Sequence, residues 1–365
     1  DVFGTTGEWM QSSGQLVLHA AASGGMVAGS ACVVTFSLQN SATNQASPSV
    51  SVSAEIQDGI GNSVGSIAAA AMIKPGTAVY GVAKGADPLT VLVPELVVKS
   101  IEQSTPVPSM ANTLTVTLMA NYDLASGSTV TITGLTGSQT ADTASLDVVS
   151  TPDCLEAGGA WTRSLGQLVL TAASGGMVAG SSCVAEFILK NSGSNQSSPL
   201  VRVSVLGFHS MGDIVFWIDE ADMESPGTTL FGVFMGTDPL TVRVPAFTDK
   251  SIGQSTPVSG AANTLSITLI ANYDLTRGSI VTISGLTGSE TGSTENLPLS
   301  STSNVLGTEG VWNQGSGELV LTAFAEGIIA GSQYEVMLSL KNKASVQASP
   351  SVEISASIEY GGIKM

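Results

Sequence analysis

The sequence predicts an all-β protein built from tandem Ig-like antiparallel β-sandwich modules in a repeat of about 151 residues. Residues 111–140 recur at 262–291 with 22 identities in 30 positions. Between clusters of Asn, Gly, Ser and Pro, runs of 5–9 residues alternate apolar with small polar side chains. This period of two is typical of half-buried strands. The most helix-like run, 67–73, has the β-prone counterpart 215–219, so we expect strands throughout.

The same elements open every copy in the same order. A Trp is followed by a Leu-Val-Leu strand, then by a turn of Ala, Gly and Ser, which are common turn residues. A longer strand with apolar residues at alternate positions comes next, and a Ser-Pro turn ends the series. These elements begin at Trp9, Leu16, Ala28, Cys32 and Ser47, at Trp161, Leu168, Ala179, Cys183 and Ser198, and at Trp312, Leu319, Ala330, Tyr334 and Ser349.

Each copy divides into two modules. Module A has about seven strands, enough for a complete antiparallel sandwich. Module B has about four and is small for a core of its own, so we expect it to pack on its neighbour or to borrow a strand. The predicted boundaries are 1–94 (module A of repeat 1), 95–150 (module B of repeat 1), 151–245 (linker and module A of repeat 2), 246–300 (module B of repeat 2) and 301–365 (linker and incomplete module A of repeat 3).

The third copy lacks part of its module A. Met365 corresponds to Ile214, so counterparts of residues 215–245 are absent. A sandwich without these strands has an open core and unpaired edges. Two interpretations stand: the chain continues in a longer polypeptide, or another subunit donates the missing strand.

Composition excludes several classes of partner. The net charge is −17 and the 12 basic residues are dispersed, whereas nucleic acids and anionic lipids require basic patches. No run reaches the length of a membrane span, so we expect no membrane insertion in this segment. Only 11% of residues are charged. A neutral surface rich in hydroxyl groups suits a chain that assembles or that carries sugar.

The three cysteines predict one disulfide. Cys32 and Cys183 occupy the same position in successive copies, while Cys154 lies in the linker before the second copy. We predict a bond between Cys154 and Cys183, which closes a loop of about 30 residues, and leave three buried thiols as the alternative. Cys32 is then unpaired, or bonded to a segment upstream of Asp1.

Nothing in the sequence predicts catalysis. The two histidines do not recur at equivalent places, and a nucleophile needs a base beside it. The acidic run of Asp219, Glu220, Asp222 and Glu224 could bind calcium through its carboxylates. Copy 1 has Ala70, Ala71 and Lys74 in that region, so we expect a solvated segment, no metal site and no cofactor.

Other candidate sites are aromatic or glycosylated. Trp9, Trp161 and Trp312 are predicted core or inter-module anchors, with stacking on sugars as the alternative. Asn195 heads the Asn-Gln-Ser glycosylation sequon, in a Ser- and Asn-rich loop. The segment 211–236 differs between copies and is the predicted ligand loop, carrying exposed Phe216 and Trp217 beside Asp219 and Glu220.

Three boxes of sequence carry a resemblance to a known group of proteins. They are Ser128–Thr140 (STVTITGLTGSQT), Ser251–Pro257 (SIGQSTP) and Gln45–Pro48 (QASP). In these boxes the chain resembles large tandem-repeat proteins predicted in eukaryotic algae of the haptophyte and stramenopile type. The resemblance covers nearly the whole chain and implies a secreted or cell-surface location.

Together these features predict an extracellular structural repeat protein rather than an enzyme. We expect it to self-assemble into a fibre, surface appendage or wall layer, with itself as partner in a homopolymer or a longer tandem array. The alternative is a cell-surface adhesin or carbohydrate-binding array, in which the variable segments contact glycans.

Overall fold

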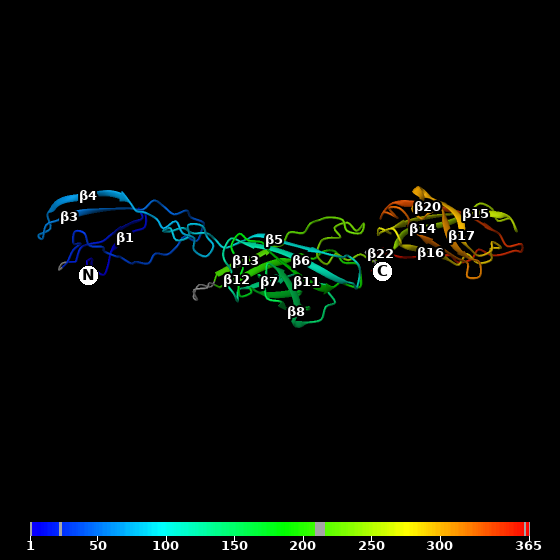
Figure 1. Ribbon diagram of the computed structural model, residues 1–365, viewed down its shortest axis with the longest axis horizontal. Coiled ribbons are helices and arrows are strands. Elements are labelled where there is room, and N and C mark those ends of the chain that lie inside the picture. Colours follow the sequence, from blue (N-terminus) through cyan, green and yellow to red (C-terminus); the bar gives the residue numbers. More distant parts are fainter. Residues whose placement is uncertain (1, 22–23, 209–215, 361–362, 365) are drawn as a thin grey trace. The chain divides into compact units, whose positions relative to one another are not determined.

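The computed structural model describes residues 2–21, 24–208, 216–360 and 363–364. The fold is all-β, as the sequence predicts, and the described residues contain no α-helix (Figure 1). A single 3-10 element, η1 (Thr302–Asn304), interrupts the series of strands. The chain forms two compact units: Asp1–Met72 with Pro88–Val93, and Ile73–Asp87 with Pro94–Met365.

The first unit contains two separate hairpins. Its first antiparallel pair is β1–β2 and its second is β3–β4, and no further strand joins either pair among the described residues. The run 67–73, predicted to be a strand, lies largely within β4. The strands are β1 (Glu8–Met10), β2 (Gln15–Val17), β3 (Ser51–Gln57) and β4 (Ser63–Ala71).

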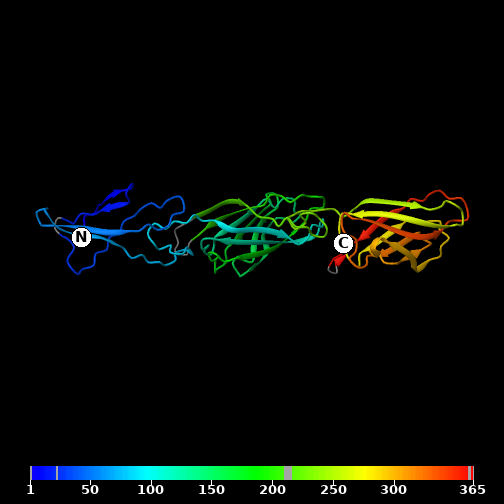
Figure 2. The same cartoon turned by 90° about the horizontal axis from the view of Figure 1, so that it is seen from above.

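The second unit contains two β-sandwiches. In the first sandwich, nine strands follow the order β13-β12-β7-β10-β9-β8-β11-β6-β5. It is coloured cyan to green in Figures 1 and 2. The strands are β5 (Leu96–Gln103), β6 (Ala111–Ala120), β7 (Thr129–Thr133), β8 (Thr143–Thr151), β9 (Gly158–Thr162), β10 (Gln167–Thr171), β11 (Cys183–Lys190), β12 (Arg202–Gly207) and β13 (Phe216–Asp222).

The second sandwich has eight strands in the order β14-β15-β20-β17-β18-β19-β16-β21. The short hairpin of β22 (Glu359–Tyr360) and β23 (Ile363–Lys364) follows it. The sandwich strands are β14 (Phe247–Gln254), β15 (Ala262–Ala271), β16 (Ile280–Ser284), β17 (Thr294–Ser301), β18 (Glu309–Asn313), β19 (Glu318–Thr322), β20 (Gln333–Lys341) and β21 (Glu353–Ser357).

The two sandwiches share one pattern of strand pairing. In the first, Cys183 of β11 lies opposite Leu118 of β6. In the second, Tyr334 of β20 lies opposite Leu269 of β15, and both positions are shifted by 151 residues. The register is set by alternation along the strands, since a slip of one residue would turn the apolar side chains away from the core. β6 shows this alternation over its whole length, with buried residues at every second position.

One strand changes layers within each sandwich. In β8, Thr143–Asp147 pairs with β9 and the following residues, Val148–Thr151, pair with β11. A β-bulge lies between Thr143 and Leu146, and bulges bend a strand and increase its twist. β17 divides in the same way between β18 and β20. This bend joins the two layers into one continuous core.

The predicted module boundaries do not match the folded units. The boundary at 150/151 lies inside β8, and β11 of repeat 2 lies between β6 and β8 of repeat 1. The first sandwich therefore combines the residues predicted as module B of repeat 1 with those predicted as module A of repeat 2. Residues 246–300 combine in the same way with residues 301–358. A single hydrophobic core joins each pair of segments.

Residues 1–94 were expected to form a complete sandwich, and this prediction is wrong. All of β3 and β4 is exposed. Phe36 is 56% exposed, whereas its counterpart Phe187 in the first sandwich is 2% exposed. In the first sandwich β6 and β8 cover Phe187, and no such strands pair with the first unit among the described residues. Apolar residues placed for a core thus lie on the surface.

Fragments of the chain test this assignment of folded units. We expect residues 94–243 to unfold cooperatively, because they contain all nine strands of the first sandwich and its core. Residues 151–245, the predicted module, should lack a cooperative transition, since β9–β13 alone leave the core open. Circular dichroism during thermal unfolding compares the two fragments. A cooperative transition of 151–245 at a similar temperature would contradict the assignment.

Candidate functional site

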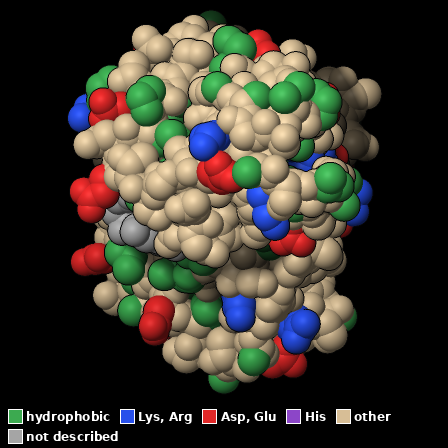
Figure 3. All heavy atoms as spheres, turned by 90° about the vertical axis from the view of Figure 1, so that its right-hand side faces the viewer, with side chains coloured by type: hydrophobic (Ala, Val, Ile, Leu, Met, Phe, Trp, Pro, Cys, Tyr) green, Lys and Arg blue, Asp and Glu red, His purple; other side chains and the backbone are tan. Residues whose placement is uncertain are grey.

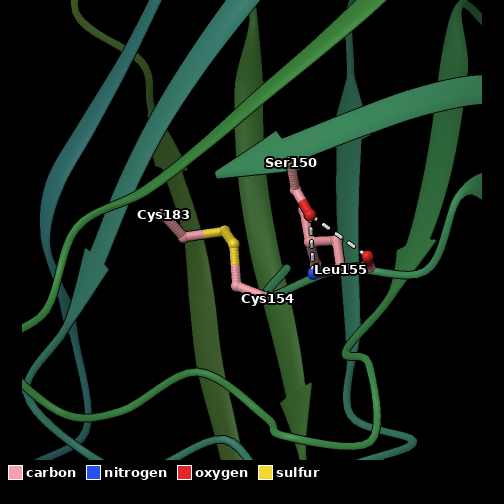
Figure 4. The surroundings of a disulfide bond; sticks show 4 residues. All are labelled: Ser150, Cys154, Leu155 and Cys183. Carbon is pink, nitrogen blue, oxygen red and sulfur yellow. Dashed lines mark hydrogen bonds between the residues drawn. A yellow bond between two sulfur atoms is a disulfide. The ribbon is translucent and has the colours of Figure 1, made fainter. Parts of the chain in front are cut away.

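The structure contains the disulfide that the sequence predicts. Cys154 and Cys183 are bonded, with their Cα atoms 6.1 Å apart (Figure 4). Both residues are buried. Beside them, the hydroxyl of Ser150 accepts a hydrogen bond from the Leu155 amide and donates one to the Leu155 carbonyl, both at 3.1 Å. The turn between β8 and β9 is thus attached to β11, and both cysteines lie after the predicted repeat boundary at 150/151.

The second sandwich uses apolar side chains at these positions. Val305 corresponds to Cys154 and Tyr334 to Cys183, and both are buried in one cluster. The hydroxyl of Tyr334 accepts a hydrogen bond from the Ile329 amide at 3.1 Å. The neighbouring serine keeps its role, since Ser301 accepts from the Leu306 amide at 3.2 Å. Cys32, in the first unit, is a half-buried free thiol.

Two of the three predicted tryptophan anchors lie in the sandwich cores. Trp161 and Trp312 are almost fully buried. The Trp161 indole donates to the Thr140 carbonyl at 3.1 Å, which joins residues of successive repeats. Trp312 donates to the Thr291 carbonyl at 3.0 Å. Trp9 is 42% exposed and is therefore not a core anchor, while its role as an inter-module anchor stays a prediction. Among the described residues of the first unit, β1 pairs only with β2, whereas the strand that carries Trp161, β9, pairs with both β8 and β10.

A buried amide network ties the β5–β6 turn to β11. The Asn112 amide nitrogen donates to Gln103 at 2.7 Å and to Asn191 at 2.8 Å. Asn191 in turn donates to the carbonyls of Thr105 and Val107, both at 2.9 Å. All of these partners are needed, because a buried amide without hydrogen bonds is costly. In the second sandwich, Asn263, Gln254 and Asn342 repeat the central contacts.

This network was not predicted from the sequence. Its signal was present, because Asn112 and Asn263 stand at the same place in the repeated Ala-Asn-Thr-Leu. A polar residue directly before an apolar strand is more often a turn residue, so position alone does not reveal a buried amide. Burial depends on Asn191, which comes from the next repeat.

The network continues into the joint between the sandwiches. The Gln103 side chain donates to the carbonyls of Gly236 and Thr241, at 2.8 and 2.9 Å. The buried Tyr273 hydroxyl of the second sandwich lies 2.7 Å from the Arg243 carbonyl and 3.1 Å from the Pro106 carbonyl. Burial raises the pKa of Tyr273 well above its usual range. The segment 236–243 is therefore bonded to both sandwiches.

In the same joint, a glycine allows the backbone at residue 232 to lie close to Ala330 and Asp274 of the second sandwich. Gly232 has a φ of +78°, and a Cβ atom there would lie 2.4 Å from the Ala330 Cβ. It would also lie 2.6 Å from Asp274 Oδ1, the oxygen that accepts the Ala330 amide at 2.8 Å. Gly81, Asp123 and Ala179 repeat this arrangement against the first sandwich. Only glycine fits such a left-handed, crowded position without strain.

The predicted ligand loop is partly a strand. Phe216 was expected to be exposed, but it packs against the first core, 5.5 Å from the Tyr122 ring. Trp217 points outward and is 66% exposed. Glu220 accepts a hydrogen bond from Thr133 at 2.9 Å, while Asp219 is exposed. Residues 211–215, at the start of this predicted loop, lie outside the described residues.

No cluster of three or more His, Cys, Asp or Glu side chains that could hold a metal ion occurs in the described part of the chain. In the acidic run, Arg202 pairs with Asp222 at 2.9 Å and with Glu220 at 3.9 Å.

The described residues also contain no helix long and apolar enough to span a membrane. The face in Figure 3 is mostly uncharged, and several of its basic side chains lie beside acidic ones.

Asn195, the predicted glycosylation site, lies in an exposed loop. Its side-chain oxygen accepts a hydrogen bond from the Val244 amide at 2.6 Å. Asn44 makes the same contact with Val93, also at 2.6 Å, without a sequon. The asparagine therefore has a role in the loop that does not require a sugar, and glycosylation of Asn195 stays a prediction.

No protein-family model and no curated protein matches the chain. Among solved structures, it is similar to the C-terminal domain of the Streptococcus pyogenes antigen I/II-family protein AspA. The identity is 13% and the TM-score 0.41, over 75% of this chain and 97% of that chain. Another similar chain comes from a structure of Gaeumannomyces graminis manganese lipoxygenase with part of Komagataella pastoris zonadhesin. Its identity is 9% and its TM-score 0.20, over 73% of this chain and 90% of that one. Similarity at these scores carries no functional argument.

Removal of the disulfide tests its role in attaching the β8–β9 turn to β11. We expect the double variant Cys154→Ser, Cys183→Ser to lower the free energy of unfolding of the first sandwich by about 2–4 kcal/mol, because the open chain gains entropy. Hydrogen exchange of β9–β11 measures the loss, with β18–β20 as internal reference. Cys32→Ser is the matched control and should change neither the free energy of unfolding of the first sandwich nor the hydrogen exchange of β9–β11. Equal losses in both sandwiches would contradict a local crosslink.

The buried tyrosine predicts a loss of stability at alkaline pH. The unfolded chain releases the Tyr273 proton near pH 10, whereas the folded chain, with its raised pKa, retains it. Stability of the second sandwich should therefore fall as pH rises above about 10. Hydrogen exchange of β14 and β15 across this pH range follows the fall.

The variant Tyr273→Phe should lack this component of the pH dependence. It should also be less stable at neutral pH by about 1 kcal/mol, through loss of the hydroxyl's hydrogen bond. Tyr122→Phe, at the equivalent position of the first sandwich, is the control. In this variant the stability of the second sandwich should still fall above about pH 10. An unchanged alkaline profile in Tyr273→Phe would overturn the role given to this hydroxyl.

Proposed function

We propose that the protein is an extracellular structural repeat protein that self-assembles into a fibre, surface appendage or wall layer. One observation carries this proposal: each sandwich is built from the end of one repeat and the start of the next. Successive repeats are then joined by sheet hydrogen bonds and a common core rather than by a free linker. Such joints resist extension, because separating two repeats requires unfolding a sandwich.

The chemistry of the chain supports the location and the partner. A buried disulfide is typical of proteins that fold in an oxidising compartment. The surface has few charges to keep copies apart, since 11% of all residues are charged. We assign the sandwiches to the Ig-like class and regard them as units of a tandem array, in which the chain itself is the main partner.

Electron microscopy of the native, unboiled material tests this function. We expect regular filaments or layers whose repeat along the axis matches the spacing of successive sandwiches. The variant Gly232→Val, which crowds the joint at Ala330 and Asp274, should make the filaments irregular without unfolding either core. Thr228→Val, an exposed position nearby, is the control. Dispersed single particles from native material would contradict the proposal.

A second function, a carbohydrate-binding adhesin, is favoured by Trp217 alone. Its ring is exposed on β13, and exposed aromatic rings stack on sugars. Binding to a glycan array that disappears in Trp217→Ala would establish this function. Phe234→Ala, another exposed aromatic position, should leave such binding unchanged.

A further inference from the structure

In the first sandwich, Trp217 shares the outer face of a sheet layer with polar side chains from neighbouring strands. On β12, every second residue is buried in the core and the others face outward, among them Leu206, which lies opposite Trp217. Towards the start of β12, Arg202 lies opposite Asp222 of β13 on one side and Thr133 of β7 on the other. Alternate residues of a strand point to the same face. Trp217 and Arg202 therefore mark the two ends of one surface.

The polar end of this surface is held in place by contacts among its own side chains. Arg202 pairs with Asp222 at 2.9 Å and with one carboxylate oxygen of Glu220 at 3.9 Å. The other oxygen of Glu220 accepts a hydrogen bond from the Thr133 hydroxyl at 2.9 Å. The side chains of Arg202 and Glu220 remain 46% and 48% exposed. Since these groups are already ordered and still reach solvent, a polar ligand can bind them at little further cost in ordering.

The comparison with repeat 1 indicates that the fold does not require these side chains. β3 and β4 share a β-bulge with β12 and β13 at the same place. The inward-facing residue beside it is Ile in both, as Ile67 and Ile218. The outer residues all differ: Trp217, Glu220, Asp222 and Arg202 correspond to Ser66, Ala69, Ala71 and Ser51. Small residues suffice for this hairpin, so the larger set adds a surface that repeat 1 lacks.

The length of this surface fits a short oligosaccharide rather than a single sugar ring. Leu206, beside the indole, and Arg202 are separated by ~13 Å along β12, given the usual rise of a strand. Between them, Ser204 of β12 lies opposite Thr131 of β7, and both residues are half-buried. A chain of linked sugar rings can stack on the indole at one end and exchange hydrogen bonds with the charged groups at the other.

Charge restricts the ligand to uncharged sugars. At the polar end, the single cation Arg202 faces the two carboxylates of Glu220 and Asp222. Asp219, on the same strand, is also exposed. The surface is therefore negatively charged, and glycans that carry uronic acids or sulfate groups are repelled from it.

We propose that the outer face of β13, β12 and β7 binds a short, uncharged oligosaccharide, with one sugar ring stacked on Trp217 and another hydrogen-bonded to Arg202 and Glu220. The inference deepens the second function given above, on which it rests, by naming the site and the class of ligand. It is independent of self-assembly, because these side chains lie outside the core that the repeats share.

Glycan arrays with matched charge test this site on the full chain. The arrays carry uncharged oligosaccharides of one to three sugar units and uronic acid oligomers of the same lengths. We expect uncharged ligands to bind more tightly as they lengthen, and the anionic ones to bind at least about tenfold more weakly. Trp217→Ala should lower affinity for the uncharged ligands at least about tenfold, and Trp217→Tyr should restore part of it, since an aromatic ring returns.

A second variant tests the polar end of the surface. Glu220→Gln keeps the length of the side chain and an acceptor for Thr133, but it removes one negative charge. It should lower affinity for the uncharged trisaccharides about threefold, because hydrogen bonds to a neutral acceptor are weaker. It should also narrow the difference between uncharged and anionic ligands. Glu186→Gln, an exposed carboxylate on β11, is the matched control and should change neither the affinity nor this difference.

Three results would contradict the site. Tighter binding of the anionic oligomers, or binding of uncharged ones that persists in Trp217→Ala, would overturn it. An unchanged affinity in Glu220→Gln would contradict the polar end and leave binding through Trp217, and so the second function, in place. Failure of every ligand to bind would overturn both the site and the second function. Filaments seen by electron microscopy would then still support self-assembly.

Discussion

The structure depends on the position of β11 between β6 and β8. Through this placement a strand of one repeat is hydrogen-bonded on both sides to strands of the preceding repeat. β20 occupies the same position between β15 and β17. A central strand is hydrogen-bonded along both of its edges, and its buried side chains pack in the core. Without this strand, the residues of the preceding repeat cannot form a closed core, and the same holds in reverse. The unit of folding is therefore displaced from the unit of sequence repetition.

The other notable contacts reinforce this displacement. The Trp161 indole and the Asn112–Asn191 amide contact each link residues on opposite sides of the sequence repeat boundary, and the disulfide attaches the β8–β9 turn to β11 within repeat 2. Gln103 and Tyr273 then extend the bonded region to the segment that leads into the second sandwich. These hydrogen bonds and packed side chains connect the two sandwiches of the second unit without a free linker.

Much of this could be predicted from local pattern. Alternation of side chains predicted the strands, and the position of Cys154 ahead of β11 predicted its bond to Cys183. The phase of the domains could not be predicted, because a periodic sequence defines the length of its repeat but not where a folded unit begins. The packing of Phe216 against the core and the exposure of Trp9 could not be predicted for a related reason. Both depend on strands that come from a distant part of the chain.

Native-state hydrogen exchange tests the central claim, that successive repeats share one core, most directly. If they do, amides of β6, β8 and β11 should open together with one free energy, because none of these strands can leave without exposing the core. The strands β15, β17 and β20 should form a second such group. Exchange of residues 95–150 as a separate unit, while β9–β13 stay protected, would contradict the account.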